Sequence, residues 1–252
     1  MPRYAQTYSN VRLASSDVRP LAHYVNSLPD DTVVVSQQAA LSRELRPFLK
    51  GERQILTAGG RPGRLDPVPE LVANEPFVYI QTGEDDAAIH SYLDESQACL
   101  ERLRFQVQAI WFCNGQAPSP VANFDDNLSL ASIGLPDRLD GDNRVTLFWE
   151  TSSGIEEDYT AFLHIIDAEG RLVGQWDQPP GGTDHPTSNW PAQTLFFDDY
   201  RVPVEVDGTP PYRLLVGLYD PQTGERLSVI ESEVGYGGDY LELETYADIA
   251  EQ

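Results

Sequence analysis

Apolar residues in the first half of the chain recur with the spacing of short helices separated by strands. In residues 16–31, SDVRPLAHYVNSLPDD, they return every three or four positions, with Ser16 as a candidate N-cap and Pro29 as a stop. The run TVVVSQ that follows has the length and β-branched content of a buried strand. The same criteria predict helices over 39–51, over 65–74 and from 85 to at least 97, and strands over 53–58, 76–81 and 104–113.

This alternation of strands and helices is typical of an α/β fold. Strands joined through helices of this length run side by side in the same direction, and the helices then cover the sheet. We therefore expect residues 1–117 to form a small α/β domain with a mostly parallel sheet and flanking helices.

The second half has a different pattern of apolar residues, and the change occurs at the loop-forming stretch NGQAPSPVAN, residues 114–123. Beyond it apolar and polar residues alternate, as in RVTLFWE, where Val145, Leu147 and Trp149 share one face. Short strands at a spacing of about ten residues are typical of an immunoglobulin-like antiparallel sandwich. We predict such an all-β domain over 118–246, with an acidic tail over 247–252.

Two turns in this half share a local design. DAEG, residues 167–170, and DPQTGERL, from Asp220, each place a glycine where a hairpin turn requires left-handed backbone, and these are Gly170 and Gly224. We interpret both turns as structural.

Charge narrows the possible partners. The chain has 40 acids and 17 bases, a formal charge of −23, and Lys50 is its one lysine. Nucleic acid is excluded as an expected partner because phosphate binding needs a basic surface. The acidic surface is interpreted as solubilising, with a cation-binding face as the alternative.

No apolar run reaches the length of about 20 residues that a membrane-spanning helix needs. The first residues, MPRYAQTYSNVRLASSD, lack the apolar core of a signal peptide. The sequence therefore describes either a cytoplasmic protein or a soluble piece of a larger one, and it leaves open whether Met1 is the natural start.

The two cysteines, Cys99 and Cys113, lie fourteen positions apart without the spacing of a zinc site. They fit one disulfide in an oxidising compartment, and two buried thiols fit equally well. The sequence also lacks GxGxxG, GxxxxGK[ST], GxSxG and HExxH, so no cofactor is expected. The glycine-rich TAGGRPGR, residues 57–64, has no lysine to hold a phosphate.

Three acids in DRLDGDN, residues 137–143, form a candidate cation site, namely Asp137, Asp140 and Asp142. Oxygen ligands at this spacing suit a divalent ion, although the EF-hand pattern is missing. A solvated turn between two strands is the alternative. Adjacent acids elsewhere do not establish glycoside hydrolysis, since that chemistry needs two carboxyl groups facing each other across a cleft.

A long loop, DQPPGGTDHPTSNWP at 177–191, is the candidate glycan site. Sugars stack their C–H faces on aromatic rings and bond their hydroxyls to polar groups. The alternative is that both tryptophans anchor the loop to the sandwich. His164, within AFLHIID, is interpreted as a hydrogen-bonded interior histidine. The candidate glycan-binding residues are Trp176, Asp177, His185, Asn189 and Trp190.

The second half also resembles a known family. The segments that carry the resemblance are NFDDNLSLASIGL, RVTLFWETSSGIEEDYTAFLHIIDAEGRLVGQWDQPP, PTSNWPAQTLFFDDYRVPV and PYRLLVGLYDPQTGERL, within residues 121–230. They resemble the C-terminal β-sandwich of bacterial membrane glycosyltransferases of the protein mannosyltransferase and aminoarabinose transferase type. The first half, from DVRPLAHYVNSLPDDTVVVS, is similar to the small extracytoplasmic α/β domain of those proteins.

The resemblance implies a non-catalytic, soluble, extracytoplasmic region of a membrane glycosyltransferase. In that family the donor is a lipid-phosphate sugar and the catalytic acids lie in membrane loops, which have no counterpart here, so no catalytic residue carries over. The implied partners are a glycan and the membrane-embedded portion of the parent protein. The alternatives are a stand-alone carbohydrate-binding or adhesion module, and a hydrolase that uses acids of the long loop.

Overall fold

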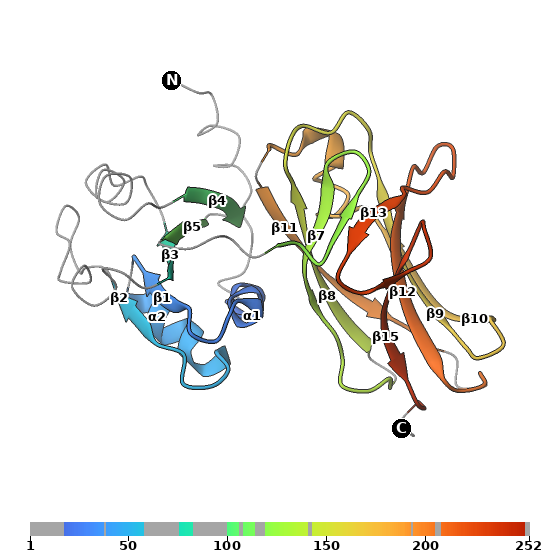
Figure 1. Ribbon diagram of the computed structural model, residues 1–252, viewed down its shortest axis with the longest axis horizontal. Helices are drawn as coiled ribbons and strands as arrows, with labels where there is room; N and C mark the ends of the chain where they lie inside the picture. The colour runs from blue at the N-terminus through green and yellow to red at the C-terminus, as the bar shows by residue number, and fades with distance from the viewer. Residues whose placement is uncertain are drawn as a thin grey trace. The chain divides into compact units, whose positions relative to one another are not determined.

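The computed structural model describes nine segments of the chain, residues 18–37, 39–57, 76–82, 100–105, 108–113, 119–140, 143–192, 194–204 and 208–249. The chain divides into two compact units, Met1–Pro118 and Ser119–Gln252 (Figure 1). Neither α-helix in the described residues is long and apolar enough to span a membrane.

The first unit contains two short α-helices and five strands in its described residues. The helix α1 begins at Arg19, with Pro20 in its first turn, and buries Leu21, Ala22 and Val25, the spacing that the sequence predicts for one helical face. The elements are α1 (Arg19–Ser27), β1 (Val33–Ser36), α2 (Ala39–Leu45), a 3-10 turn (Arg46–Phe48), β2 (Ile55–Thr57), β3 (Phe77–Thr82), β4 (Leu100–Phe105) and β5 (Gln108–Cys113).

The prediction of an α/β domain with a mostly parallel sheet and flanking helices is wrong. The sheet has the order β4-β5-β3-β1-β2, in which β1 pairs in parallel with β2 and β3, while β5 pairs antiparallel with β3 and β4. The sheet is therefore mixed. The described residues contain two α-helices, of nine and seven residues, and far more of these residues lie in strands than in helices.

The error has a physical cause near residue 100. Leu100 and Leu103 fit a helical period, but the backbone of β4 instead forms a hairpin with β5, which divides the single strand expected over 104–113. Short apolar runs fit both periods, so pairing with a neighbouring strand decides between them. The helices expected over 65–74 and 85–97 lie outside the described residues.

The second unit is built from strands, and its first three, β6 to β8, lie side by side in one sheet. A three-residue strand precedes the first strand expected from the sequence, and a two-residue strand precedes the last. The strands are β6 (Ala122–Phe124), β7 (Leu128–Gly134), β8 (Asn143–Thr151), β9 (Thr160–Ile166), β10 (Leu172–Gln178), β11 (Thr194–Val202), β12 (Tyr212–Tyr219), β13 (Val229–Ser232), β14 (Gly235–Tyr236) and β15 (Leu241–Tyr246).

These strands form two layers with a shared apolar core, so a β-sandwich is confirmed. Within this unit one layer has the order β13-β6-β7-β8-β11 and the other the order β10-β9-β12-β15-β14 (Figure 1). All pairings of these strands are antiparallel. Val145, Leu147 and Trp149 of one layer share the core with Leu214 and Val216 of the other. The alternation of apolar residues thus places one face of each sheet inward.

Local features fix the ends of these strands. Gly170 and Gly224 have φ values of 78° and 77°, so both hairpin turns use the left-handed glycine that the sequence predicts. At the start of β12, the hydroxyl of Tyr212 donates to the carbonyl of Gly208 at 2.6 Å. A tyrosine that bonds back to the backbone a few residues upstream is a recurrent corner in β-sandwiches.

Candidate functional site

The loop between β10 and β11 carries most of the candidate glycan residues, and the sandwich holds it at two points. The backbone N–H of Gly181 donates to both carboxylate oxygens of Asp198, at 3.1 and 2.9 Å. Farther along, the hydroxyl of Thr187 donates to the carbonyl of Glu157 at 2.7 Å and accepts from the N–H of Tyr159 at 2.9 Å. The loop is therefore a fixed part of the sandwich.

Trp190 anchors this loop in the core. Its side chain is 4% exposed, and its ring stacks on Phe196 with centroids 3.9 Å apart and planes 11° apart. Its indole N–H donates to the carbonyl of His185 at 2.9 Å. Because both the ring and its donor are occupied within the protein, Trp190 follows the anchoring interpretation and offers no open face to a sugar.

Trp176 has the opposite character. It lies on the edge strand β10, is 40% exposed, and donates its indole N–H to the side chain of Gln178 at 3.4 Å. In the register it stands opposite Leu163, a core residue, so the indole belongs to the inward row of the sheet and emerges at its edge. The two candidate tryptophans therefore do not form one surface.

Asp177 points to the other face of the same strand, where it meets His164 and Tyr219. Its carboxylate lies 3.7 Å from His164 Nε2 and accepts from the hydroxyl of Tyr219 at 3.3 Å. Burial lowers the pKa of His164; Asp177 acts against this shift and Arg226 adds to it. His164 is half-buried, so it is more exposed than the interior histidine that the sequence predicts.

Phe162 packs beside this group on the outer face. Its ring lies so close over Gly217 that an added Cβ would approach it to 2.4 Å, and the guanidinium of Arg226 covers it at 4.4 Å from the centroid. Arg226 also pairs with Asp239 at 3.4 Å. The guanidinium of Arg226 thus makes a cation–π contact with Phe162 and covers this outward-facing ring from solvent.

His185 and Asn189 occupy separate places on the loop. His185 is half-buried with its ring centroid 6.4 Å from that of Phe196, whereas Asn189 is exposed. The glycan candidates are thus spread over an edge strand, an outer sheet face and a loop.

The acidic candidates for a cation site are only partly described. Asp137 is exposed, Asp140 is half-buried, and Asp142 lies outside the described residues. The backbone N–H of Asp140 donates to the side chain of Asn143 at 2.6 Å, which closes the turn before β8. Within the described residues no group of three potential metal ligands is found.

Of the two cysteines, Cys113 ends β5, is buried and is disulfide-bonded. Cys99, the other cysteine in the sequence, lies outside the described residues.

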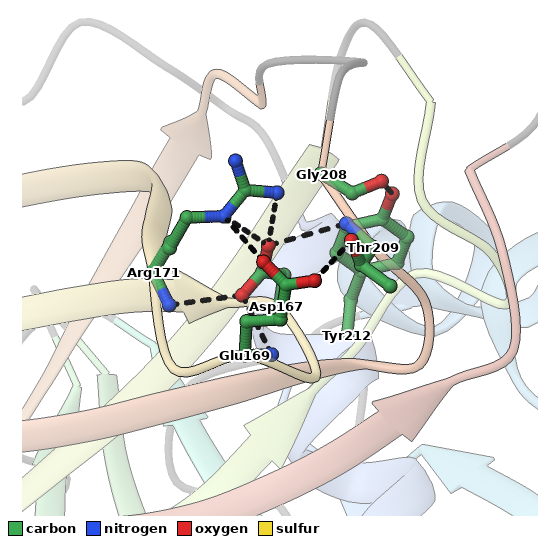
Figure 2. Close-up of polar contacts among 6 residues, drawn as sticks. All are labelled: Asp167, Glu169, Arg171, Gly208, Thr209 and Tyr212. Carbon is green, nitrogen blue, oxygen red and sulfur yellow. Dashed lines mark hydrogen bonds and ion pairs between the residues drawn. The ribbon is translucent and has the colours of Figure 1, made fainter.

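A densely bonded polar site lies at Asp167, which the sequence indicated only as part of a turn. Asp167 is fully buried, with 0% of its surface exposed, and Figure 2 shows its carboxylate at the centre of the turn. It accepts backbone N–H bonds from Glu169 at 3.0 Å, Arg171 at 2.9 Å and Thr209 at 3.2 Å. The guanidinium of Arg171 completes the set at 2.7 Å.

The electrostatics of Asp167 follow from these bonds. Burial acts to raise the pKa of Asp167, but the bonds from Arg171, Thr209 and Glu169 outweigh it and hold the pKa at about 2. The link to Thr209 joins the β9–β10 turn to the segment before β12, 42 residues away. The site is a structural junction, because every oxygen that it offers is already used by the protein.

Comparisons with known proteins identify no relative of this chain. No protein-family model, no curated protein and no solved structure matches the chain.

Proposed function

We propose that this chain is a non-catalytic, extracytoplasmic region of a membrane glycosyltransferase, and that its sandwich contacts acceptor glycan at Trp176. The resemblance of residues 121–230 to the sandwich of such enzymes supports the first part. The observation that carries the second is the indole of Trp176, which is 40% exposed at the edge of the sheet.

The position of Trp176 suits a sugar. A partly exposed indole on an edge strand presents one face to which the C–H face of a pyranose can stack. Gln178 lies on the same side of the strand and already bonds the indole N–H, so its amide can exchange that bond for a sugar hydroxyl. The other face of the strand presents Asp177. Gln178 is therefore the polar side chain of this strand that lies on the same side as the ring.

The disulfide at Cys113 supports the location. Disulfides persist in oxidising compartments and are rare where thiols are kept reduced. The bond fits a region that functions outside the cytoplasm.

The chemistry of the described acids supports a binding role. The two carboxylates with large pKa shifts, Asp167 and Asp198, are both buried and hydrogen-bonded within the sandwich. A catalytic acid needs contact with the substrate, and neither of these carboxylates is exposed enough to provide it.

The test is a glycan array followed by titration calorimetry on the full chain and two variants. We expect Trp176→Ala to weaken binding about tenfold, which corresponds to the loss of about 1.4 kcal/mol from one stacked ring. Leu172→Ala is the matched control, because Leu172 lies on the same strand, is 47% exposed and has no ring. Equal affinities for wild type and Trp176→Ala would refute the glycan contact.

A stand-alone carbohydrate-binding or adhesion module would give the same titration. The gene distinguishes the two, since several apolar stretches of about 20 residues encoded with this region would mark a membrane enzyme.

A further inference from the structure

We infer that Asn127 is an acceptor for N-linked glycan. The sequence Asn127-Leu128-Ser129 has the form Asn-x-Ser, and no other asparagine in the chain stands in this context. This pattern marks the asparagines that exported proteins can offer to a glycan-transferring enzyme. The inference rests on the proposed extracytoplasmic location.

The fold places Asn127 where such an enzyme can reach it. It is exposed and lies in the turn between β6 and β7, with Asp126 and Asn127 both in left-handed backbone at φ values of 60° and 61°. Its backbone carbonyl accepts from Ser152 at 3.2 Å, which fixes the turn. Among the described contacts none engages its carboxamide, so the side chain is free to react.

Ser129 supplies the second element of the pattern. It is half-buried on β7, and its hydroxyl donates to the side chain of Asn123 at 2.8 Å. The burial alternates along β7, so Ser129 faces away from Leu128 and Leu130, which are core residues. The hydroxyl is thus kept out of the apolar core and can exchange its single bond for one to an enzyme.

The turn itself does not require asparagine. Left-handed backbone is open to glycine and aspartate as well as to asparagine. Aspartate would meet the demand of the turn at position 127 as its neighbour Asp126 does, where the carboxylate also accepts from Tyr159 at 2.9 Å. Aspartate therefore preserves the local structure while removing the amide nitrogen.

The transfer is a simple substitution. Asn127 Nδ2 forms a bond to the anomeric carbon of a glycan carried on a polyprenyl diphosphate. The bond from that carbon to the diphosphate oxygen breaks, and its electron pair leaves with the lipid diphosphate. The nitrogen releases one proton, and no group is oxidised or reduced.

The experiment is translation of the full chain behind a cleavable export signal in the presence of microsomes, whose lipid-linked oligosaccharide is the probe. We expect the protease-protected chain to gain the mass of one glycan, and an amidase specific for glycosylated asparagine to remove it. The shift should be lost in Asn127→Asp and in Ser129→Ala.

Two variants are the controls. Ser129→Thr keeps the hydroxyl and Asn123→Gln leaves the acceptor intact, so both should keep the shift. A protease-protected wild-type chain without added mass, or a shift that persists in Asn127→Asp, would overturn the inference. The assay supplies its own export signal, so such a failure would not bear on the proposed glycan contact at Trp176. That contact is tested separately by the glycan array and calorimetry.

Discussion

The two units bury charges of opposite sign. Among the described residues of the first unit the buried charge is a cation, Arg53, which is 6% exposed and donates to the carbonyls of Leu28, Pro29 and Thr32 at 2.7 to 3.1 Å. Among those of the second unit the buried charges are the carboxylates Asp167 and Asp198, which accept from backbone N–H and hydroxyl groups. Each buried charge thus meets groups of the complementary kind, although the Nε of Arg53 is buried without a hydrogen-bond partner.

The two units also differ in their overall balance of acidic and basic residues. Residues 1–118 contain 14 acids and 11 bases, whereas residues 119–252 contain 26 acids and 6 bases. A guanidinium stays protonated at any pH that a protein tolerates, while carboxylates titrate below neutrality. We therefore expect the stability of the sandwich to depend on pH and that of the first unit to depend on it far less.

The largest effect should come from Asp167. Asp167→Ala leaves three backbone N–H groups and the Arg171 guanidinium without their acceptor, and should lower the thermal midpoint of the sandwich by about 10 °C or more. Hydrogen exchange, followed peptide by peptide, should show the loss of protection in β9, β10 and β12 and none in β1 and β3.

The pH dependence of Asp167 has a defined sign. Its folded pKa of about 2 lies below the ordinary value of 3.8, so its stabilisation is present above about pH 4 and is lost as the pH falls toward 2. Asp220→Ala is the matched control, because Asp220 opens the other glycine turn but its side chain bonds only near neighbours, Gln222 and Thr223. A similar loss in both variants would contradict the junction assigned to Asp167.

Arg53 should give the next largest effect, in the other unit. Arg53→Met removes the donor to three carbonyls and should cost about 3 kcal/mol of unfolding free energy. Protection from hydrogen exchange should fall in β1 and β3. Arg43→Met is the control, since Arg43 is exposed and donates once, to its own helix at 3.3 Å. Equal losses in β12 would show that the units unfold together, and the comparison between them would fail.

The sandwich was predictable from sequence because its signal is local. Alternation along β8 placed Val145, Leu147 and Trp149 on one face, and the structure puts all three in the core. The turn glycines were equally readable, because left-handed backbone at Gly170 and Gly224 depends on neighbours in the chain.

The first unit was less predictable because its sheet depends on pairing between strands and not on a local pattern. Whether β4 forms a strand depends on its pairing with β5, and the residue spacing around Leu100 fits a helix as well. The parallel pairs of β1 with β2 and β3 were consistent with the expected fold, but the antiparallel hairpin is not a feature of it. Tertiary pairing overrode the local pattern.

In the candidate site, too, the sequence identified local features but not the contacts between distant residues. Sequence identified Trp176 and Trp190 as a pair, but only the contact with Phe196 shows that Trp190 is an anchor. The bond from Thr209 to Asp167 joins residues 42 positions apart, so no local pattern could indicate it. The glycine turn at residues 167–170 was the local signal that the sequence offered for this site.

The smallest effect, and the sharpest test of the contrast between the units, concerns Asp198. It is 5% exposed; burial raises its pKa to about 6, although the bonds from Gly181 and Tyr200 act against that shift. A carboxyl whose folded pKa lies above its unfolded value stabilises most in its protonated form. Its contribution is therefore complete below about pH 4 and is lost as the pH rises through 6, opposite in sign to that of Asp167.

Denaturant unfolding at pH 4, 5, 6 and 7 measures this contribution. The wild-type sandwich should gain roughly 2 kcal/mol as the pH falls from 7 to 4, and Asp198→Asn should abolish that gain because the amide does not titrate. Asp184→Asn removes an equal charge from the exposed loop and should leave the gain in place. If Asp198→Asn keeps the full gain, the pH dependence belongs to the acidic surface as a whole, and the buried carboxylate is not its source.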